Sequence, residues 1–322
     1  MTLLVLGERE IESVLDMPSC IDAMADALAG LARGEFHQPL RQMIRPEGTD
    51  TLFGLMPAYR GGTNPRYGLK EIVVAPGNPA RGMDSHQGGV LLHNGETGEL
   101  VALLNASTIT ATRTAAVSAV ATRALAREGA RTVAIIGAGV QARAHVTALR
   151  AVLDNPTIRI WSRTGSHAGE MASDLGLTAV EGARDAVDGA DVVCTVTTSR
   201  EPVIERGWLR DGAHVNAVGS ASPAARELDT ATVVDASFFV DRRESALNEA
   251  GDLVIPLRAG DVGEDHIRAE LGEVLAGLHP GRERDDELTV FESLGIGVED
   301  LVAAEVVVEA ARARGLGVEI DF

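Results

Sequence analysis

A glycine-rich turn carries the clearest chemical signal in this sequence. It follows the apolar run 132–136, opens a stretch that predicts an amphipathic helix, and consists of Gly137, Ala138, Gly139, Val140 and Gln141. Gly137 permits a tight turn, and Gly139 lets the backbone approach a pyrophosphate that binds at the helix N-terminus. The pattern therefore predicts a dinucleotide-binding βα unit, the alternative being an ordinary turn with no ligand.

The residues after the next predicted strand, 157–161, indicate which nucleotide binds. An NAD site usually places Asp or Glu at the end of that strand, where the carboxylate binds the ribose 2′-hydroxyl. Here the strand is followed by Ser162, Arg163 and Thr164, whereas Asp154 precedes it in a turn. A guanidinium with two hydroxyls suits a 2′-phosphate, so we expect NADP(H) to be preferred and NAD(H) to remain possible. The alternative is that Arg163 is a solvated charge at the strand end.

Three of the cationic residues that precede the glycine-rich turn are candidates for a substrate site. Arg41 begins an apolar run, Lys70 opens the apolar strand KEIVVAPGNP, and Arg113 lies in an alanine-rich helix. Two guanidinium groups can hold a small carboxylate, and a lysine can move a proton. Lys70 is also the one lysine among 29 Lys and Arg residues, and only Lys can lose its charge at accessible pH. The alternatives are that each Arg is a surface charge and that one Lys survives by chance.

The elements that position these residues fall into two groups. Residues 10–33 predict two helices separated near Pro18, and 38–105 predict short antiparallel strands between Gly, Pro and Asn residues. Residues 107–128 predict an alanine-rich helix, after which strands and helices alternate as in a parallel sheet. A last helix is expected over 298–315. The expected class is α/β, with a Rossmann-type parallel-sheet NAD(P) domain and an α+β domain.

Composition excludes several classes of function. The 47 acidic and 29 basic residues give a net charge of −18, which argues against a nucleic-acid partner. No apolar run approaches the 18 residues that a membrane span requires, so we expect no membrane span. A charged residue occurs as early as position 8, so we expect no signal peptide. Cys20 and Cys194 lie far apart, and no metal-ligand spacing is present. We expect a cytoplasmic protein without a metal.

Many stretches match one known family in order and spacing. HQPLR, LMPAY, GLKEIVV, SHQGGVLL, ITATRTAAVSAVAT, IIGAGVQARAH, HVNAVG and FFVDRRESALNEAGD resemble the ornithine cyclodeaminase/μ-crystallin family over nearly the whole chain. The stretches IWSRT, EPVI and ESALNEAGD are most similar to μ-crystallin-like ketimine reductases. The resemblance implies a substrate-binding and dimerisation domain over 1–113, completed by a C-terminal helix in 298–322, and a Rossmann domain over 114–297. It also implies a homodimer formed through the first domain.

The resemblance also implies roles for individual residues. Arg41, Lys70 and Arg113 match substrate-pocket positions, with both Arg residues holding a substrate carboxylate. Positions on or near the cofactor are matched by Ser85, His86, Thr112, Arg113, Gly137, Ala138, Gly139, Val140, Gln141, Ser162, Arg163, Thr164, Thr195 and Ser293. The alternative for His86 is a neutral histidine that stabilises a turn.

One departure from the family pattern bears on the substrate. Ornithine cyclodeaminases carry an Asp that engages the distal amine of the substrate, and Ala221 stands in the matching segment here. Alanine cannot bind an ammonium group. We therefore expect an NADP(H)-dependent imine reductase or amino-acid dehydrogenase that acts on a small cyclic ketimine carboxylate, or on a 2-oxo acid with an amine. The alternatives are an ornithine cyclodeaminase and a non-catalytic NADPH-dependent binding protein.

Overall fold

The computed structural model describes residues 2–322, which form two compact units. One unit comprises Met1–Arg113 with Gly295–Phe322, and the other comprises Thr114–Leu294. The long helix α3 (Ala106–Leu125) contributes residues to both units. Within the described residues, no helix combines the length and the apolar run that a membrane-spanning segment requires. Cys20 and Cys194 are free, buried thiols.

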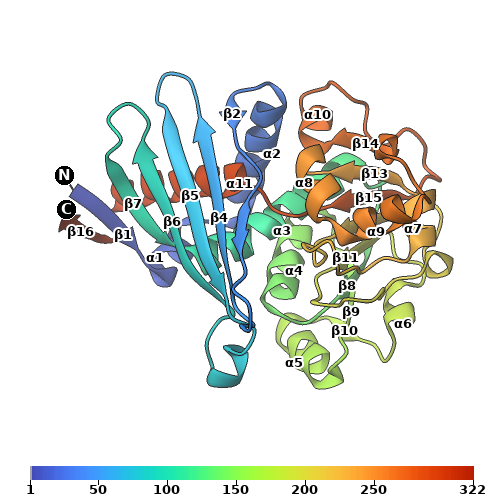
Figure 1. Ribbon diagram of the computed structural model, residues 1–322. Coiled ribbons are helices and arrows are strands. Elements are labelled where there is room, and N and C mark those ends of the chain that lie inside the picture. Colours follow the sequence, from blue (N-terminus) through green and yellow to red (C-terminus); the bar gives the residue numbers. More distant parts are fainter. Residues whose placement is uncertain (1) are drawn as a thin grey trace. The chain divides into compact units, whose positions relative to one another are not determined.

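An eight-stranded mixed sheet forms the frame of the first unit (Figure 1). Its order is β16-β1-β7-β6-β5-β4-β2, with β3 also paired to β4. All neighbouring strands are antiparallel except β1 and β7, which are parallel. The strands are β1 (Thr2–Leu6), β2 (Phe36–His37), β3 (Gln42–Ile44), β4 (Leu52–Arg60), β5 (Arg66–Val74), β6 (His86–Asn94), β7 (Leu100–Asn105) and β16 (Val318–Asp321). The antiparallel strands predicted within 38–105 are confirmed, and β6 and β7 form a hairpin.

Helices α1 (Glu8–Val14), α2 (Met17–Ala32) and α11 (Gly297–Arg314) complete this unit, with a short η1 turn (Pro79–Arg81) between β5 and β6. The break between α1 and α2 near Pro18 is confirmed, and Asp16 caps α2 by accepting a hydrogen bond from the Ser19 N–H at 3.0 Å. Helix α11 packs against α2, β4 and β5 and runs across the sheet (Figure 1). A Cβ on Gly68 would lie 2.8 Å from Leu301 Cβ, so this glycine lets α11 approach β5 closely.

Two expectations about this unit are wrong in detail. Lys70 lies at the middle of β5 rather than at its head, because the strand already begins at Arg66. The segment 298–322 is not helical throughout: α11 ends at Gly315, whose φ is +64°, and β16 then pairs antiparallel with β1. This pairing joins the two ends of the sequence, and a contact between segments so far apart leaves no local pattern for the sequence to reveal.

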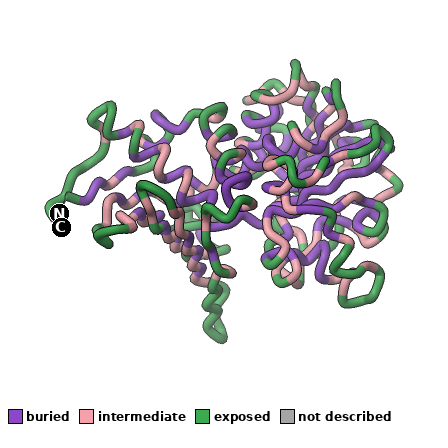
Figure 2. Tube along the Cα trace, turned by 90° about the horizontal axis from the view of Figure 1, so that it is seen from above, coloured by how far each residue is buried: buried purple, intermediate pink, exposed green. Residues whose placement is uncertain are grey.

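The second unit is built on an eight-stranded sheet in which every neighbouring pair is parallel. The order is β10-β9-β8-β11-β12-β15-β13-β14, for β8 (Thr132–Ile136), β9 (Thr157–Trp161), β10 (Thr178–Ala179), β11 (Val192–Thr195), β12 (His214–Ala217), β13 (Ser237–Val240), β14 (Ile267–Glu270) and β15 (Thr289–Glu292). The expected Rossmann-type sheet is confirmed. Its central strands are fully buried, as Figure 2 shows, which explains their continuous apolar sequences.

Helices and short turns connect these strands. They are α4 (Val140–Val152), α5 (Gly165–Leu175), α6 (Ala183–Val187), α7 (Thr230–Asp235), α8 (Arg243–Glu249), α9 (Gly251–Ala259), α10 (Leu271–Leu275), η2 (Arg206–Trp208) and η3 (Glu264–His266). The strand order reverses direction between β8 and β11. In doubly wound sheets, ligands bind beyond the carboxyl ends of the strands at such a reversal.

Candidate active site

Lys70 lies on the buried face of the first unit's sheet. It pairs with Met56 on β4 and with Val90 on β6, and only 2% of its surface is exposed. Side chains alternate between the two faces of a strand, so Lys70 shares this face with Gly68, beneath α11. A buried ammonium group requires a partner because its desolvation is costly.

That partner is Asp300 on α11, which binds two cations at once. Its Oδ2 lies 2.9 Å from Lys70 Nζ, and its Oδ1 accepts a hydrogen bond from Arg113 Nε at 2.9 Å. Arg113 Nη1 also binds Glu299 Oε2 at 2.6 Å. All four side chains are at most 4% exposed. We call Lys70, Arg113, Glu299 and Asp300 the buried charge group; its two positive and two negative charges balance.

The environment of Lys70 makes its proton available near neutral pH. Burial and, next, the positive charge of Arg113 lower the pKa of Lys70, which is about 8 in the folded protein. Asp300 and Glu299 act in the opposite direction and keep the ammonium form from being lost altogether. Lys70 Nζ also lies 3.4 Å from Thr110 Oγ1. A lysine with a pKa near 8 can both donate and accept a proton under physiological conditions.

Arg113 is a buried residue, not the surface charge that was the alternative. It is 3% exposed and lies well inside α3. The chain passes close to it at Gly295, where φ is +73° and an added Cβ would lie 2.4 Å from Arg113 Nη1. Glycine is required at this position both for its backbone conformation and for the space it leaves.

Arg41 lies beside β3 and is half-buried. Arg41 directly precedes Gln42, which pairs with Leu55 on β4, the neighbour of Met56. Met56 in turn pairs with Lys70. Arg41 therefore lies at the end of a strand that pairs with β4, and β4 pairs with the strand that carries Lys70.

Glu299 and Asp300 were missed by the sequence reasoning. Both sit in a run, 294–301, in which every residue is buried. The signal was present: two adjacent carboxylates inside a run that otherwise consists of apolar residues and glycine are too costly to bury without cations. The lone lysine and Arg113 were the available partners.

The second unit carries the predicted nucleotide residues at the carboxyl edge of its sheet. Gly137 follows β8 with a φ of +123°, and an added Cβ would lie 2.7 Å from the carbonyl oxygen of Val196. Gly139 begins α4 with no side-chain cap, and a Cβ there would meet no atom within 4 Å. Gly139 therefore leaves room at the N-terminus of α4, which fits a bound pyrophosphate.

The other candidate cofactor residues are distributed over both units. In the second unit, Ser162, Arg163 and Thr164 follow β9, with Arg163 exposed and Ser162 Oγ donating to the Thr164 carbonyl at 2.8 Å. Thr195 ends β11, Ala221 is exposed after β12, and Ser293 follows β15.

Ser85 and His86 lie at the start of β6 in the first unit, and Ser85 Oγ lies 3.0 Å from His86 Nδ1. Thr112 directly precedes Arg113 on α3.

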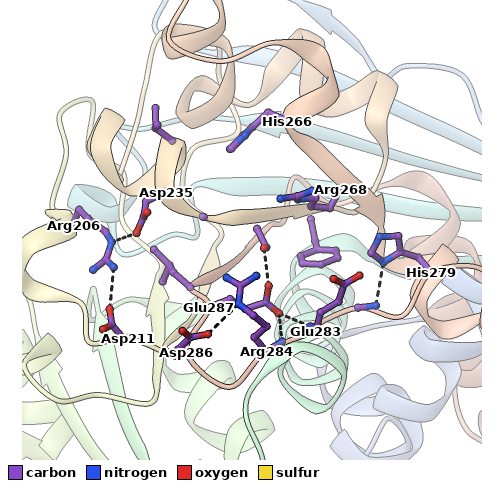
Figure 3. Close-up of a pocket in the computed structure, with 16 residues that line it drawn as sticks. Arg206, Asp211, Asp235, His266, Arg268, His279, Glu283, Arg284, Asp286 and Glu287 are labelled. Atoms are coloured by element: carbon purple, nitrogen blue, oxygen red, sulfur yellow. Dashed lines mark hydrogen bonds and ion pairs between the residues drawn. The ribbon is translucent and has the colours of Figure 1, made fainter.

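A cavity of about 440 Å³ opens at the opposite, amino-terminal edge of the second sheet (Figure 3). Most of its charged side chains are already paired with one another: Arg206 binds Asp211 and Asp235, and Arg284 binds Asp286. Because this edge lies away from the glycine-rich turn, we do not assign the cavity to the dinucleotide.

Comparison with known proteins identifies the family. The model of the ornithine cyclodeaminase/mu-crystallin family matches residues 1–315. The chain belongs to this family. It is 37% identical to ketimine reductase mu-crystallin of Mus musculus over 311 residues, covering 95% of this chain and 96% of the relative.

Two solved structures of the family are similar along their whole length. One is the Thermococcus litoralis delta(1)-pyrroline-2-carboxylate reductase in complex with NADH and L-proline, with 36% identity, a TM-score of 0.93, and 98% and 100% of the two chains covered. The other is an archaeal alanine dehydrogenase dimer with bound NAD, with 33% identity, a TM-score of 0.94 and full coverage of both chains. Family members thus hold a nicotinamide dinucleotide on this fold.

The single lysine allows the pKa of Lys70 to be measured without assignment. In protein grown with lysine labelled at 13Cε, one side-chain signal is expected, and its shift should titrate with a midpoint of about 8. Asp300→Asn should move the midpoint to lower pH, because the carboxylate stabilises the ammonium form. A midpoint near 10.5 in the wild type would contradict the buried charge group.

Proposed function

We propose that this protein is an NADP(H)-dependent reductase of small cyclic ketimine carboxylates, such as pyrroline-2-carboxylate or piperideine-2-carboxylate. A 2-oxo acid with ammonia or an amine is an allied substrate. The observation that carries the proposal is a lone lysine, buried 2.9 Å from Asp300, with a pKa of about 8. The similarity to a pyrroline-2-carboxylate reductase and to ketimine reductase mu-crystallin supports the same chemistry.

Lys70 is the proton donor in this proposal. Below a pH of about 8 its ammonium group can protonate the imine nitrogen, and Asp300 directs and stabilises that group. A bound nicotinamide supplies the hydride for the carbon of the C=N bond. In the reverse direction, neutral Lys70 accepts the proton from the amino group of the product.

We assign the substrate carboxylate to Arg41 and Arg113. The buried charge group is neutral before substrate binds, so a carboxylate adds one uncompensated negative charge. Arg41, directly before β3, is the second guanidinium that we assign to the carboxylate. Substrate positioning of this kind lowers the entropic part of the barrier.

The nucleotide is assigned to the carboxyl edge of the second sheet. The N-terminus of α4 binds the pyrophosphate, and Ser162, Arg163 and Thr164 bind the 2′-phosphate of NADP(H). Gly137 and Gly139 provide the room described above. NAD(H), which relatives hold, differs only in lacking that phosphate.

Arg163→Ala tests the nucleotide preference. Loss of one charge-assisted bond to the 2′-phosphate should weaken NADPH binding about ten- to hundredfold and leave NADH binding unchanged. Fluorescence titration with each nucleotide measures both constants. The preference for NADP(H) is wrong if the wild type binds NADH more tightly.

Lys70→Met tests the reaction itself. We expect NADPH oxidation with cyclic ketimines to fall about a hundredfold or more, because the general acid is lost, while NADPH binding is retained. The wild-type rate of reduction should also decline as pH rises through about 8, where Lys70 loses its proton.

The same assay separates the alternatives. Wild-type-like turnover by Lys70→Met would remove Lys70 from the mechanism. Conversion of ornithine to proline with catalytic NAD would favour a cyclodeaminase, despite Ala221. An absence of NADPH oxidation across ketimines, and across oxo acids with amines, would favour a binding protein.

We also propose a homodimer formed through the face of the first sheet that is opposite Lys70. Tyr67 and Val73, 51% and 39% exposed, lie on this face, and the Tyr67 ring packs on Tyr59 with centroids 4.7 Å apart. An archaeal relative is a dimer. Exposed apolar surface of this kind is typical of protein interfaces.

Tyr67→Asp should convert the dimer to a monomer, because a charge would be buried in the interface. Light scattering should then give about the chain mass of 33.7 kDa in place of twice that value. Val234→Asp, at an exposed position of the second unit, is the matched control and should remain dimeric. A monomeric wild type would contradict the proposal.

A further inference from the structure

Four carboxyl groups are buried together in the second unit, and the mechanism above uses none of them. Glu227, Asp241, Asp252 and Glu292 are each at most 1% exposed. They lie after β12, after β13, on α9 and at the end of β15. Their neighbourhood is the carboxyl edge of the sheet, where the loop after β12 carries Ala221.

Two of the four have hydrogen-bond donors on both oxygens. Glu227 Oε1 accepts from the Thr197 N–H at 2.7 Å, and Glu227 Oε2 accepts from the Gly219 N–H at 2.7 Å. Asp241 accepts from the N–H groups of Arg242 and Leu294 at 2.7 and 2.8 Å. Donors of this kind favour the ionised form, but burial outweighs them at Glu227 and raises its pKa to about 7.

The other two each have one oxygen without a donor. Asp252 Oδ1 accepts from the N–H groups of Glu227 and Leu228 at 2.9 and 2.8 Å, and Glu292 Oε1 accepts from Ser220 Oγ at 2.8 Å. Among the described residues, Asp252 Oδ2 and Glu292 Oε2 have no hydrogen-bond partner, and solvent does not reach them. If both carboxyls were ionised, each would bury a negative charge on an oxygen without a donor. This would strongly destabilise the folded protein.

A metal ion is not the explanation that the described residues support. Across residues 2–322, no group of three or more His, Cys, Asp and Glu side chains has the arrangement of a metal site. Protonation of one carboxyl removes the cost instead, because a neutral carboxylic acid places no charge on the oxygen that lacks a donor.

We propose that Glu292 is a protonated carboxylic acid in the folded protein and thereby positions Ser220 and the loop that carries Ala221. Asp252 receives two backbone N–H groups, which favour its ionised form, whereas Glu292 receives one hydroxyl. Burial, followed by the charges of Asp252, Glu227 and Asp241, raises the pKa of Glu292 well above its usual value. Arg226 is the cation that acts on Asp252.

Ser220 transmits this arrangement to the loop. Its hydroxyl donates to Glu292, its Oγ accepts from the Asp252 N–H at 3.4 Å, and its carbonyl accepts from the Gly251 N–H at 3.3 Å. Ionised Glu292 would repel Asp252 and separate α9 from the end of β15. The consequence for substrate binding rests on the proposed function, but the protonation state does not.

Infrared difference spectroscopy in D₂O at neutral pH tests the protonation state without substrate. The wild type should show a carboxylic-acid C=O band that is missing in Glu292→Gln. The amide matches a neutral acid in shape, so Glu292→Gln should keep the wild-type urea midpoint, whereas Glu292→Ala should lower it. The proposal is overturned if that band is missing from the wild type, or if Glu292→Gln is as unstable as Glu292→Ala.

Ser220→Ala is the matched variant for positioning. It should retain the carboxylic-acid band and the NADPH affinity but raise KM for the ketimine about three- to tenfold, the loss of one hydrogen bond. An unchanged KM, with measurable turnover, would remove the positioning role. If no ketimine is reduced by the wild type, the proposed function fails while the infrared result still decides the state of Glu292.

Discussion

The first unit depends on the balance of charge among Lys70, Arg113, Glu299 and Asp300. None of these side chains is more than 4% exposed, so each loses almost all of its hydration on folding. Removing one partner from such a group typically lowers the free energy of unfolding by about 3–5 kcal/mol, because a buried charge is left uncompensated. The geometry of β5, α3 and α11 is therefore constrained by electrostatics as well as by apolar packing. Gly68 and Gly295 provide the close approaches that the group requires.

The second unit differs from the first in how it holds charged groups. Its glycine-rich turn offers N–H groups and space rather than buried cations, which suits a ligand that carries its own negative charge. Its buried carboxylates are held largely by backbone N–H groups at the ends of parallel strands. A protein with a net charge of −18 thus buries a balanced group of cations and carboxylates in the first unit and a cluster of carboxyl groups in the second.

Much of this architecture was predictable from local pattern. The glycine-rich turn, the alternation after residue 130 and the hairpin of β6 and β7 each depend on neighbours in sequence, and all three are found. Lys70 stood out because it is the only lysine. Its partners did not, because Asp300 lies 230 positions away and meets it only when α11 returns to the sheet. The β1–β16 pair was hidden for the same reason.

A double-mutant cycle between Lys70 and Asp300 tests the central claim most directly. Lys70→Met leaves the buried group with one negative charge in excess and Asp300→Asn leaves it with one positive, whereas the double variant is neutral again. The account predicts that the double variant loses less free energy of unfolding than the two single losses together, by about 0.5–3 kcal/mol. Strict additivity of the two losses would show that Lys70 and Asp300 do not stabilise each other and would contradict the account.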